Sequence, residues 1–286
     1  MRDGAGVRNL MDITGRVGEP LAVVVSAMGK TTNALADALS HAVNGDREAV
    51  RVRLEAIKSS HEGIMDELSL QDRDLFYSTF SELEESLLRR PLGPDYDMMY
   101  DGTVSYGELL STAIVASYAR QCGVEAVRVD MRECLVTDDR YREATVDFEE
   151  SAERLRKVVE CGARMFVMQG FIGGTRDGRA TTLGREGSDY TAAAVASMLG
   201  CESVTIWKDV DGILSADPRI FSDVTLIDRL SYVDAVELAY SGAQIIHPKT
   251  IKPLQNKNIP LYVRPFGAPD KPGSCICRWD DYVPPR

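Results

Sequence analysis

The fold is decided by two stretches, RMFVMQGFIGGT at residues 164–175 and TTLGREGSDYTAAAVAS at residues 181–197. Residues 164–169 are mostly apolar and are predicted to form a buried strand. The glycines that follow permit unusual backbone angles and the close approach of a ligand. The second stretch enters a helix of mostly small residues, predicted over 188–199. A strand, a glycine-rich loop and a helix are the repeating unit of parallel α/β proteins.

The same alternation continues in both directions along the chain. Strands are predicted at residues 21–27, 126–130, 203–208 and 260–264, and helices at 6–15, 31–43, 104–121, 148–161 and twice near 231–257. Residues 45–90 are charged and helical without a strand candidate, so we interpret them as a helical excursion from the core. The pattern predicts an α/β fold, a three-layer αβα sandwich with a mostly parallel sheet.

The composition excludes several classes of protein. The 286 residues are 44% hydrophobic and 27% charged, which excludes disorder, collagen and coiled coil. The 33 basic and 44 acidic residues give a net charge of −11, which argues against a nucleic acid or an anionic membrane as the main partner. The sequence has no run of 18 apolar residues, so no membrane span is predicted. Six scattered cysteines indicate a cytoplasmic protein, and the three histidines lack metal-ligand spacing.

Ligands of parallel α/β sheets bind at the carboxyl ends of the strands, so functional residues are expected directly after each apolar run. The first such turn is SAMGKTTN at residues 26–33. Its GKT resembles a phosphate-binding P-loop, but that motif needs a glycine at position 24, which is Val24. The turn is either a polar helix cap or a ligand loop that presents hydroxyls and amides, with Ser26 and Thr32 as candidates.

The helix at 104–119 carries a single charge, Glu108, in sixteen residues. A helix so apolar is buried on most sides, and an unpaired buried carboxylate is costly. Glu108 therefore either faces solvent, caps the helix, or faces a cavity where it pairs with a ligand cation such as an ammonium group.

The loop at 181–191 concentrates groups suited to an anionic ligand. Arg185 supplies a forked cation for a carboxylate or phosphate, and Ser188 is predicted to be the N-cap of the next helix. Asp189 could hold Mg²⁺ or orient a reacting group. The alternative is a structural capping loop.

A polar stretch, KDVDGILSADPR at residues 208–219, follows the strand predicted at 203–208. Its Asp-x-Asp-Gly hints at calcium, but the glycine falls at the wrong position for an EF-hand and the final Glu is missing, so we reject calcium. On pattern alone the stretch is equally compatible with a surface loop. His247, which precedes Pro248, is expected to pack or to cap a helix rather than to act as a base.

Together these segments resemble the catalytic domain of the aspartate kinases, within the amino acid kinase fold. The resemblance runs from about residue 2 to residue 276. Its most specific parts are TLGREGSDYTA (182–192), WKDVDG (207–212) with ADPR (216–219), and GAQIIHP (242–248). It implies one amino acid kinase domain over 1–286, with an amino-acid-binding lobe at 1–200 and a nucleotide-binding lobe at 201–286.

The resemblance implies transfer of the γ-phosphate of ATP, with Mg²⁺, to the β-carboxylate of L-aspartate. The product is 4-phospho-L-aspartate, in the first step of lysine, threonine and methionine biosynthesis. It also implies a cytoplasmic homodimer. Carried over residue by residue, it assigns Asp189 to the organisation of the transfer site. It assigns aspartate binding to Ser26, Thr32, Glu108, Arg185 and Ser188, and nucleotide binding to Lys208, Asp209 and Arg219.

The chain also departs from the family pattern. The family opens with a strand and a Lys-Phe-Gly-Gly loop, whereas this chain begins at the helix that follows them. We expect Met1 to mark a truncated or misassigned start, and this form to be poorly active or inactive. No regulatory ACT domain is recognised either. Two alternatives stay open: another amino acid kinase with a different acceptor, and a chain that binds ligand without turnover.

Overall fold

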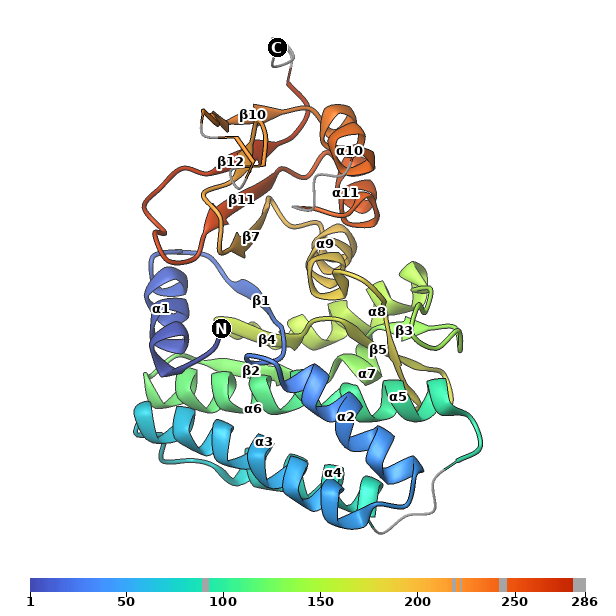
Figure 1. The fold of residues 1–286 in the computed structure, drawn as a ribbon. Coiled ribbons are helices and arrows are strands. Elements are labelled where there is room, and N and C mark those ends of the chain that lie inside the picture. The colour runs from blue at the N-terminus through green and yellow to red at the C-terminus, as the bar shows by residue number, and fades with distance from the viewer. Residues whose placement is uncertain (89–92, 218–219, 222, 242–245, 280–286) are drawn as a thin grey trace. The chain divides into compact units, whose positions relative to one another are not determined.

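A computed structural model describes residues 1–88, 93–217, 220–221, 223–241 and 246–279 (Figure 1). The chain forms two compact units, Met1–Ser188 (unit 1) and Asp189–Arg286 (unit 2). Among the described residues, no helix is both long enough and apolar enough to cross a membrane.

The centre of unit 1 is a three-stranded parallel sheet. Its order is β1-β4-β2, formed by β1 (Leu21–Val25), β4 (Met165–Gln169) and β2 (Ala126–Val129). Every residue of the central strand β4 is buried, as expected for a strand covered on both faces. Because all three strands run the same way, their carboxyl ends lie at one edge of the sheet.

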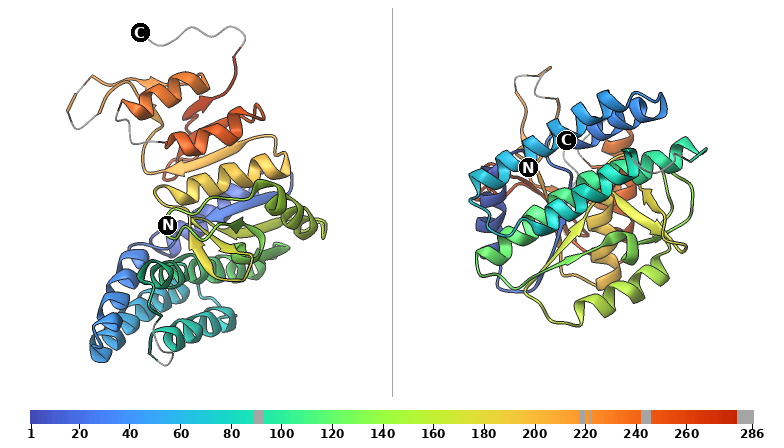
Figure 2. Two further views of the ribbon diagram at one scale, coloured as in Figure 1. Left: turned by 90° about the vertical axis from the view of Figure 1, so that its right-hand side faces the viewer. Right: turned by 90° about the horizontal axis from the view of Figure 1, so that it is seen from below.

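Helices account for most of the rest of unit 1. They are α1 (Gly4–Gly15), α2 (Thr31–Val43), α3 (Arg47–Glu67), α4 (Asp74–Leu88), α5 (Tyr96–Val104), α6 (Tyr106–Gln121), α7 (Met131–Cys134) and α8 (Phe148–Val159). The buried helix α6 packs against all three strands of the sheet, and α4 packs against α6 (Figure 1). The helices α3 and α4 lie side by side at one end of unit 1, where the excursion was predicted (Figure 2).

The glycine-rich segment after β4 contains a hairpin that the sequence did not predict. Strands β5 (Ile172–Thr175) and β6 (Ala180–Thr182) pair antiparallel, and β3 (Val136–Thr137) adds to β5 in parallel. A Cβ at Gly174 would lie only 2.1 Å from the carbonyl oxygen of Arg132. The glycine is therefore required because the backbone of α7 packs directly on this strand.

Unit 2 has a four-stranded mixed sheet in the order β10-β12-β11-β7. Its strands are β7 (Val204–Lys208), β10 (Arg229–Leu230), β11 (Leu261–Pro265) and β12 (Ser274–Ile276); β8 (Ile213–Leu214) and β9 (Leu226–Ile227) form a separate pair. The helices are α9 (Gly187–Leu199), which crosses the boundary between the units, α10 (Tyr232–Tyr240) and α11 (Pro248–Gln255). Side chains from β7, β11 and these helices share one apolar core.

The predicted fold class is confirmed: the chain is a mixed α/β protein with parallel-sheet character and a helical excursion. The predicted helices and strands match the observed ones to within a few residues, with α5 and several short elements added. Helix α9 begins at Gly187, so Ser188 lies in its first turn and the prediction that it forms the N-cap was wrong. His247 is the N-cap of α11 and accepts a hydrogen bond from the Lys249 amide, as expected for a capping residue.

Candidate active site

The carboxyl edge of the β1-β4-β2 sheet brings two predicted loops together. Val25 and Gln169 are partners at the ends of β1 and β4, and the Gly170 amide donates to the Val25 carbonyl at 2.9 Å. Ser26 and Phe171 follow these partners in the chain. The turn that starts at Ser26 and the glycine-rich loop therefore leave the sheet side by side.

The first of these loops packs on the start of helix α6. A Cβ at Gly107 would lie 2.9 Å from the Ala27 Cβ and 3.6 Å from Thr32 Oγ1, so only glycine admits this approach. The Ala27 amide donates to Glu108 Oε1 at 3.1 Å. This packing places the exposed Ser26 and the half-buried Thr32 beside the Glu108 helix.

Glu108 is a buried carboxylate with no cation paired to it in the part of the chain that the structure describes. Its exposed fraction is 3%, and Oε2 has no hydrogen-bond partner among the described residues. Burial raises the pKa of Glu108 to about 8, although the hydrogen bond from Ala27 acts in the opposite direction. Glu108 therefore does not face solvent, although it also accepts a hydrogen bond from its own backbone amide in the first turn of α6. Of the three roles left open by the sequence, pairing with a ligand cation fits this environment.

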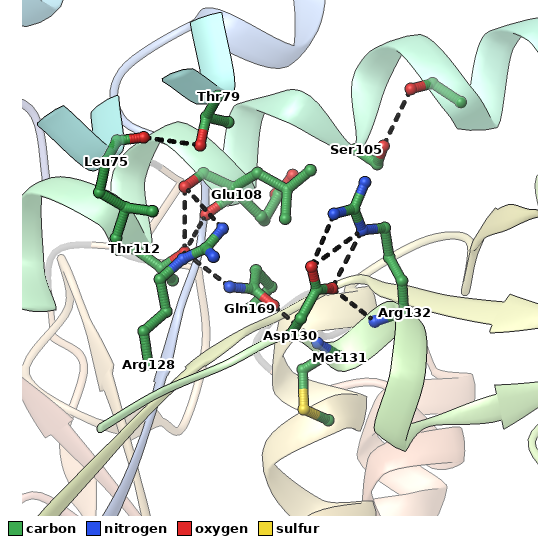
Figure 3. Close-up of polar contacts among 12 residues, drawn as sticks. Leu75, Thr79, Ser105, Glu108, Thr112, Arg128, Asp130, Met131, Arg132 and Gln169 are labelled. Carbon is green, nitrogen blue, oxygen red and sulfur yellow. Dashed lines mark hydrogen bonds and ion pairs between the residues drawn. The ribbon is translucent and has the colours of Figure 1, made fainter. Parts of the chain in front are cut away.

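A buried network fixes the helix turn that carries Glu108 (Figure 3). Thr112 Oγ1 donates to the Glu108 carbonyl at 2.8 Å and accepts from Gln169 Nε2 at 2.7 Å. Gln169 Oε1 in turn accepts from the Met131 amide at 2.8 Å, and Arg128 Nε donates to Thr112 Oγ1 at 3.2 Å. The network connects α6 to the end of β4 and to the start of α7. These hydrogen bonds hold the backbone of Glu108, and therefore the position of its carboxylate.

A further loop, residues 183–188 after β6, is held against the end of β4. A Cβ at Gly170 would lie 2.5 Å from Ser188 Oγ, so Ser188 packs directly on the backbone there. The Gly187 amide donates to the Gly184 carbonyl, which closes a tight turn around Arg185. The Arg185 side chain is exposed and has no ion-pair partner among the described residues, so its guanidinium remains available for an anion.

Backbone strain gathers around this loop. Three non-glycine residues have a left-handed backbone there: Glu186 at φ 53°, Phe171 at φ 68° and Arg142 at φ 68°. The Phe171 carbonyl accepts from the Leu183 amide at 2.9 Å, so two strained segments are joined to each other. Left-handed non-glycine residues are costly and tend to cluster at ligand sites.

Unit 2 holds the other candidate residues that the structure describes. Lys208 ends β7, and its Nζ lies 2.6 Å from Asp189 Oδ2 at the start of α9, an ion pair with both side chains mostly buried. Asp209 follows at the exposed end of the strand. Arg219 lies outside the described residues. The structure therefore pairs Lys208, which the resemblance assigned to nucleotide binding, with Asp189, which it assigned to the transfer site.

A magnesium ion would need oxygen donors from the site. The described residues contain no group of three His, Cys, Asp or Glu side chains that could hold a metal. Mg²⁺ is usually bound through one or two carboxylates together with substrate phosphates. Asp189 supplies one carboxylate of this kind, although its Oδ2 is already paired with Lys208.

Sequence reasoning missed the groups that support the site. The sequence analysis did not identify Gln169 or Thr112. Gln169 could have been identified, because it is a polar residue at the end of an apolar strand. Asp101 was missed as well. Its side chain is fully buried and accepts from Thr182, at the entrance to the Arg185 loop.

The fold places the chain among the α/β proteins with parallel-sheet character, a class whose ligands generally bind at the carboxyl ends of the strands. Residues 1–265 match the family model described as the amino acid kinase family. The chain belongs to this family.

Within the family, the chain is similar to aspartokinases. It is 36% identical to Aspartokinase 1, chloroplastic, of Arabidopsis thaliana over 91% of this chain and 47% of the relative. It is 38% identical to Lysine-sensitive aspartokinase 3 of Escherichia coli over 64% of this chain and 41% of the relative. The solved structure of E. coli aspartokinase III in complex with aspartate and ADP matches with a TM-score of 0.84 and 30% identity, over 98% of this chain and 62% of that one. The chain thus spans less than half the length of these two curated relatives.

Proposed function

We propose that the chain carries the catalytic domain of an aspartate kinase, which transfers the γ-phosphate of ATP to the β-carboxylate of L-aspartate. The observation that carries this proposal is Glu108. This buried carboxylate, which has no cation beside it among the described residues, contacts the turn after β1, and the Arg185 loop packs on Gly170 after the neighbouring strand β4. A zwitterionic amino acid supplies the missing ammonium and also an anion for the guanidinium.

Each candidate in unit 1 has a role that follows from its chemistry. Glu108 pairs with the α-ammonium group, which removes the cost of its buried charge. Arg185 binds a carboxylate through its two parallel N–H groups. The hydroxyls of Ser26, Thr32 and Ser188 complete the hydrogen bonds of the acceptor.

The chemistry needs little beyond positioning. The β-carboxylate oxygen of aspartate forms a bond to the γ-phosphorus while the bond to the bridging oxygen of ADP breaks. A carboxylate is already a nucleophile, so no base is required, which agrees with His247 being a helix cap. Lys208 places a positive charge for phosphate oxygens, and Asp189 holds and orients that lysine. Mg²⁺ would neutralise part of the phosphate charge.

A single-turnover experiment tests the proposal. The chain, in excess over ATP with Mg²⁺, is mixed with carbon-labelled L-aspartate. Hydroxylamine then displaces phosphate from any acyl phosphate and leaves a stable, labelled hydroxamate. Excess enzyme makes even slow transfer measurable. We expect aspartyl hydroxamate from L-aspartate and little product from D-aspartate or L-glutamate. Preferred transfer to L-glutamate or UMP would assign another acceptor, and binding of aspartate without transfer would favour the non-catalytic alternative.

A homodimer and a role in lysine, threonine and methionine biosynthesis are proposed on the family resemblance alone, and a cytoplasmic location on the six scattered cysteines as well. Sedimentation equilibrium tests the dimer directly, and a mass near 31.5 kDa would contradict it.

A further inference from the structure

Asp101, on helix α5, is a buried carboxylate outside the set of residues assigned to substrate. Its exposed fraction is 0%. Oδ1 accepts from Thr182 Oγ1 at 2.8 Å, and Oδ2 accepts from the Thr182 amide at 2.7 Å and from the Arg142 amide at 2.9 Å. Three hydrogen bonds over long sequence separations make this one carboxylate a junction between α5, β6 and the 138–145 segment.

The first side of the junction leads to the loop that carries Arg185. Thr182 is the last residue of β6, and the Arg185 turn begins two residues later. The Thr182 carbonyl accepts from the Ala144 amide at 2.9 Å, so the strand is held from both sides. A Cβ at Gly184 would lie 3.2 Å from the Arg142 carbonyl oxygen. The left-handed Arg142, held through its amide by Asp101, is therefore packed against the base of the loop.

The second side of the junction leads to Glu108. The Asp101 carbonyl accepts from the Ser105 amide, and the Ser105 carbonyl accepts from the Leu109 amide, both at 3.2 Å. Helices α5 and α6 are therefore joined by continuous hydrogen bonds through Ser105. Asp101 and Glu108 lie seven residues apart on this segment, and a displacement at one is transmitted to the other.

We propose that Asp101 is a positioning residue for the amino-acid acceptor, because its carboxylate couples the helix that carries Glu108 to the loop that carries Arg185 and Ser188. This inference rests on the proposed function. In the proposed function, Glu108 binds the ammonium group and Arg185 binds a carboxylate of the same small molecule. The distance between these two side chains must therefore be fixed. Asp101 fixes it without contacting the substrate.

The test compares three variants with the wild type. Asp101→Ala leaves the Thr182 and Arg142 amides without their acceptor. Asp101→Asn is the conservative variant: its Oδ1 can accept from both amides while its Nδ2 donates to Thr182 Oγ1. Thr182→Val removes only the hydroxyl contact and keeps the side-chain shape. Ser151→Ala is the matched control, because Ser151 is fully buried and accepts from the Val136 amide, away from the loop.

Calorimetric titrations with L-aspartate and with ADP–Mg²⁺ provide the readout. Misplacement of binding groups by about 1 Å costs on the order of 10- to 100-fold, so we expect at least a tenfold loss of aspartate affinity in Asp101→Ala. Thr182→Val should lie between Asp101→Ala and the wild type. ADP affinity should stay within about twofold of the wild type, and Asp101→Asn should keep aspartate affinity within about threefold. Ser151→Ala should lower stability without changing either affinity.

Two results would overturn the inference: wild-type aspartate affinity in Asp101→Ala, or an equal loss of both ligands. Hydrogen exchange separates its failure from that of the proposed function. If the wild type does not bind L-aspartate, the proposed function fails. If the amides of residues 183–187 exchange no faster in Asp101→Ala than in Ser151→Ala, the positioning role fails, whatever the wild type binds.

Discussion

Replacement of Glu108 by glutamine should change how the stability of the ligand-free chain depends on pH. Glu108 is 3% exposed, and burial raises its pKa from 4.5 to about 8. Below pH 4.5 the group is neutral in both the folded and the unfolded state. Between the two pKa values the unfolded state ionises first, so the folded state loses stability as the pH rises, and above pH 8 the loss is complete.

The size of the effect follows from the shift. One pKa unit corresponds to about 1.4 kcal/mol, so a shift from 4.5 to about 8 corresponds to up to about 5 kcal/mol of stability lost across this range. A glutamine cannot ionise and escapes this loss. The other groups titrate alike in both proteins, so the free energy of unfolding of Glu108→Gln minus that of the wild type should grow with pH by this amount.

Urea unfolding measured by far-ultraviolet circular dichroism at a series of pH values provides the assay. This probe is needed because both tryptophans, Trp207 and Trp279, lie in unit 2, whereas Glu108 is in unit 1. Glu84→Gln, an exposed site on α4, is the matched control, for which the difference from the wild type should stay constant. A pH-independent difference for Glu108→Gln as well would refute the reasoning about its burial.

Three further results are expected. Aspartate binding near pH 7 should release about one proton, because a neutral Glu108 must ionise to pair with the ammonium group; calorimetry in buffers of different ionisation enthalpy measures it, and buffer-independent heats would contradict it. Gly170→Ala should destabilise unit 1 by about 1–3 kcal/mol and weaken aspartate binding, because its methyl group would lie 2.5 Å from Ser188 Oγ. Gly63→Ala, where a methyl group meets nothing within 4 Å, should do neither in the same urea and binding measurements. Lys208→Met should weaken ADP–Mg²⁺ binding about tenfold or more, since it removes the cation that lies 2.6 Å from Asp189. Lys208→Arg should preserve most of the affinity, and an unchanged affinity in Lys208→Met would remove Lys208 from the nucleotide site.

The sequence predicted the main elements because their patterns are local. The apolar run at 164–169 and the single charge of the helix at 104–119 are visible within one window, and both proved buried. The hairpin β5–β6 could not be predicted, because β5 contains Gly173 and Gly174 and glycine has a low propensity for strands. The reason for Gly174 lies in the backbone of Arg132, more than forty residues away.

The candidate site was predicted only in part, for a similar reason. Glu108 stood out because it is alone in an apolar helix, whereas Asp101 follows Asp95 and Asp97 and looks like one more surface acid. Its burial depends on Thr182 and Arg142, which meet it only in the folded chain. Ser188 was expected at the helix N-cap, but α9 begins at Gly187, where a Cβ would lie 2.6 Å from Phe171 Cδ2, a contact that only the folded chain shows.

The central claim is that Glu108 recognises the ammonium group of the acceptor. The most direct measurement compares the affinities of L-aspartate and succinate, which lacks only that group, for the wild type and for Glu108→Gln. Truncation of one partner of a buried charge pair costs about 2–5 kcal/mol, so the wild type should prefer aspartate by roughly 30-fold or more. The glutamine variant should lose most of that preference while keeping its affinity for succinate. An equal preference for aspartate in both proteins would contradict the account.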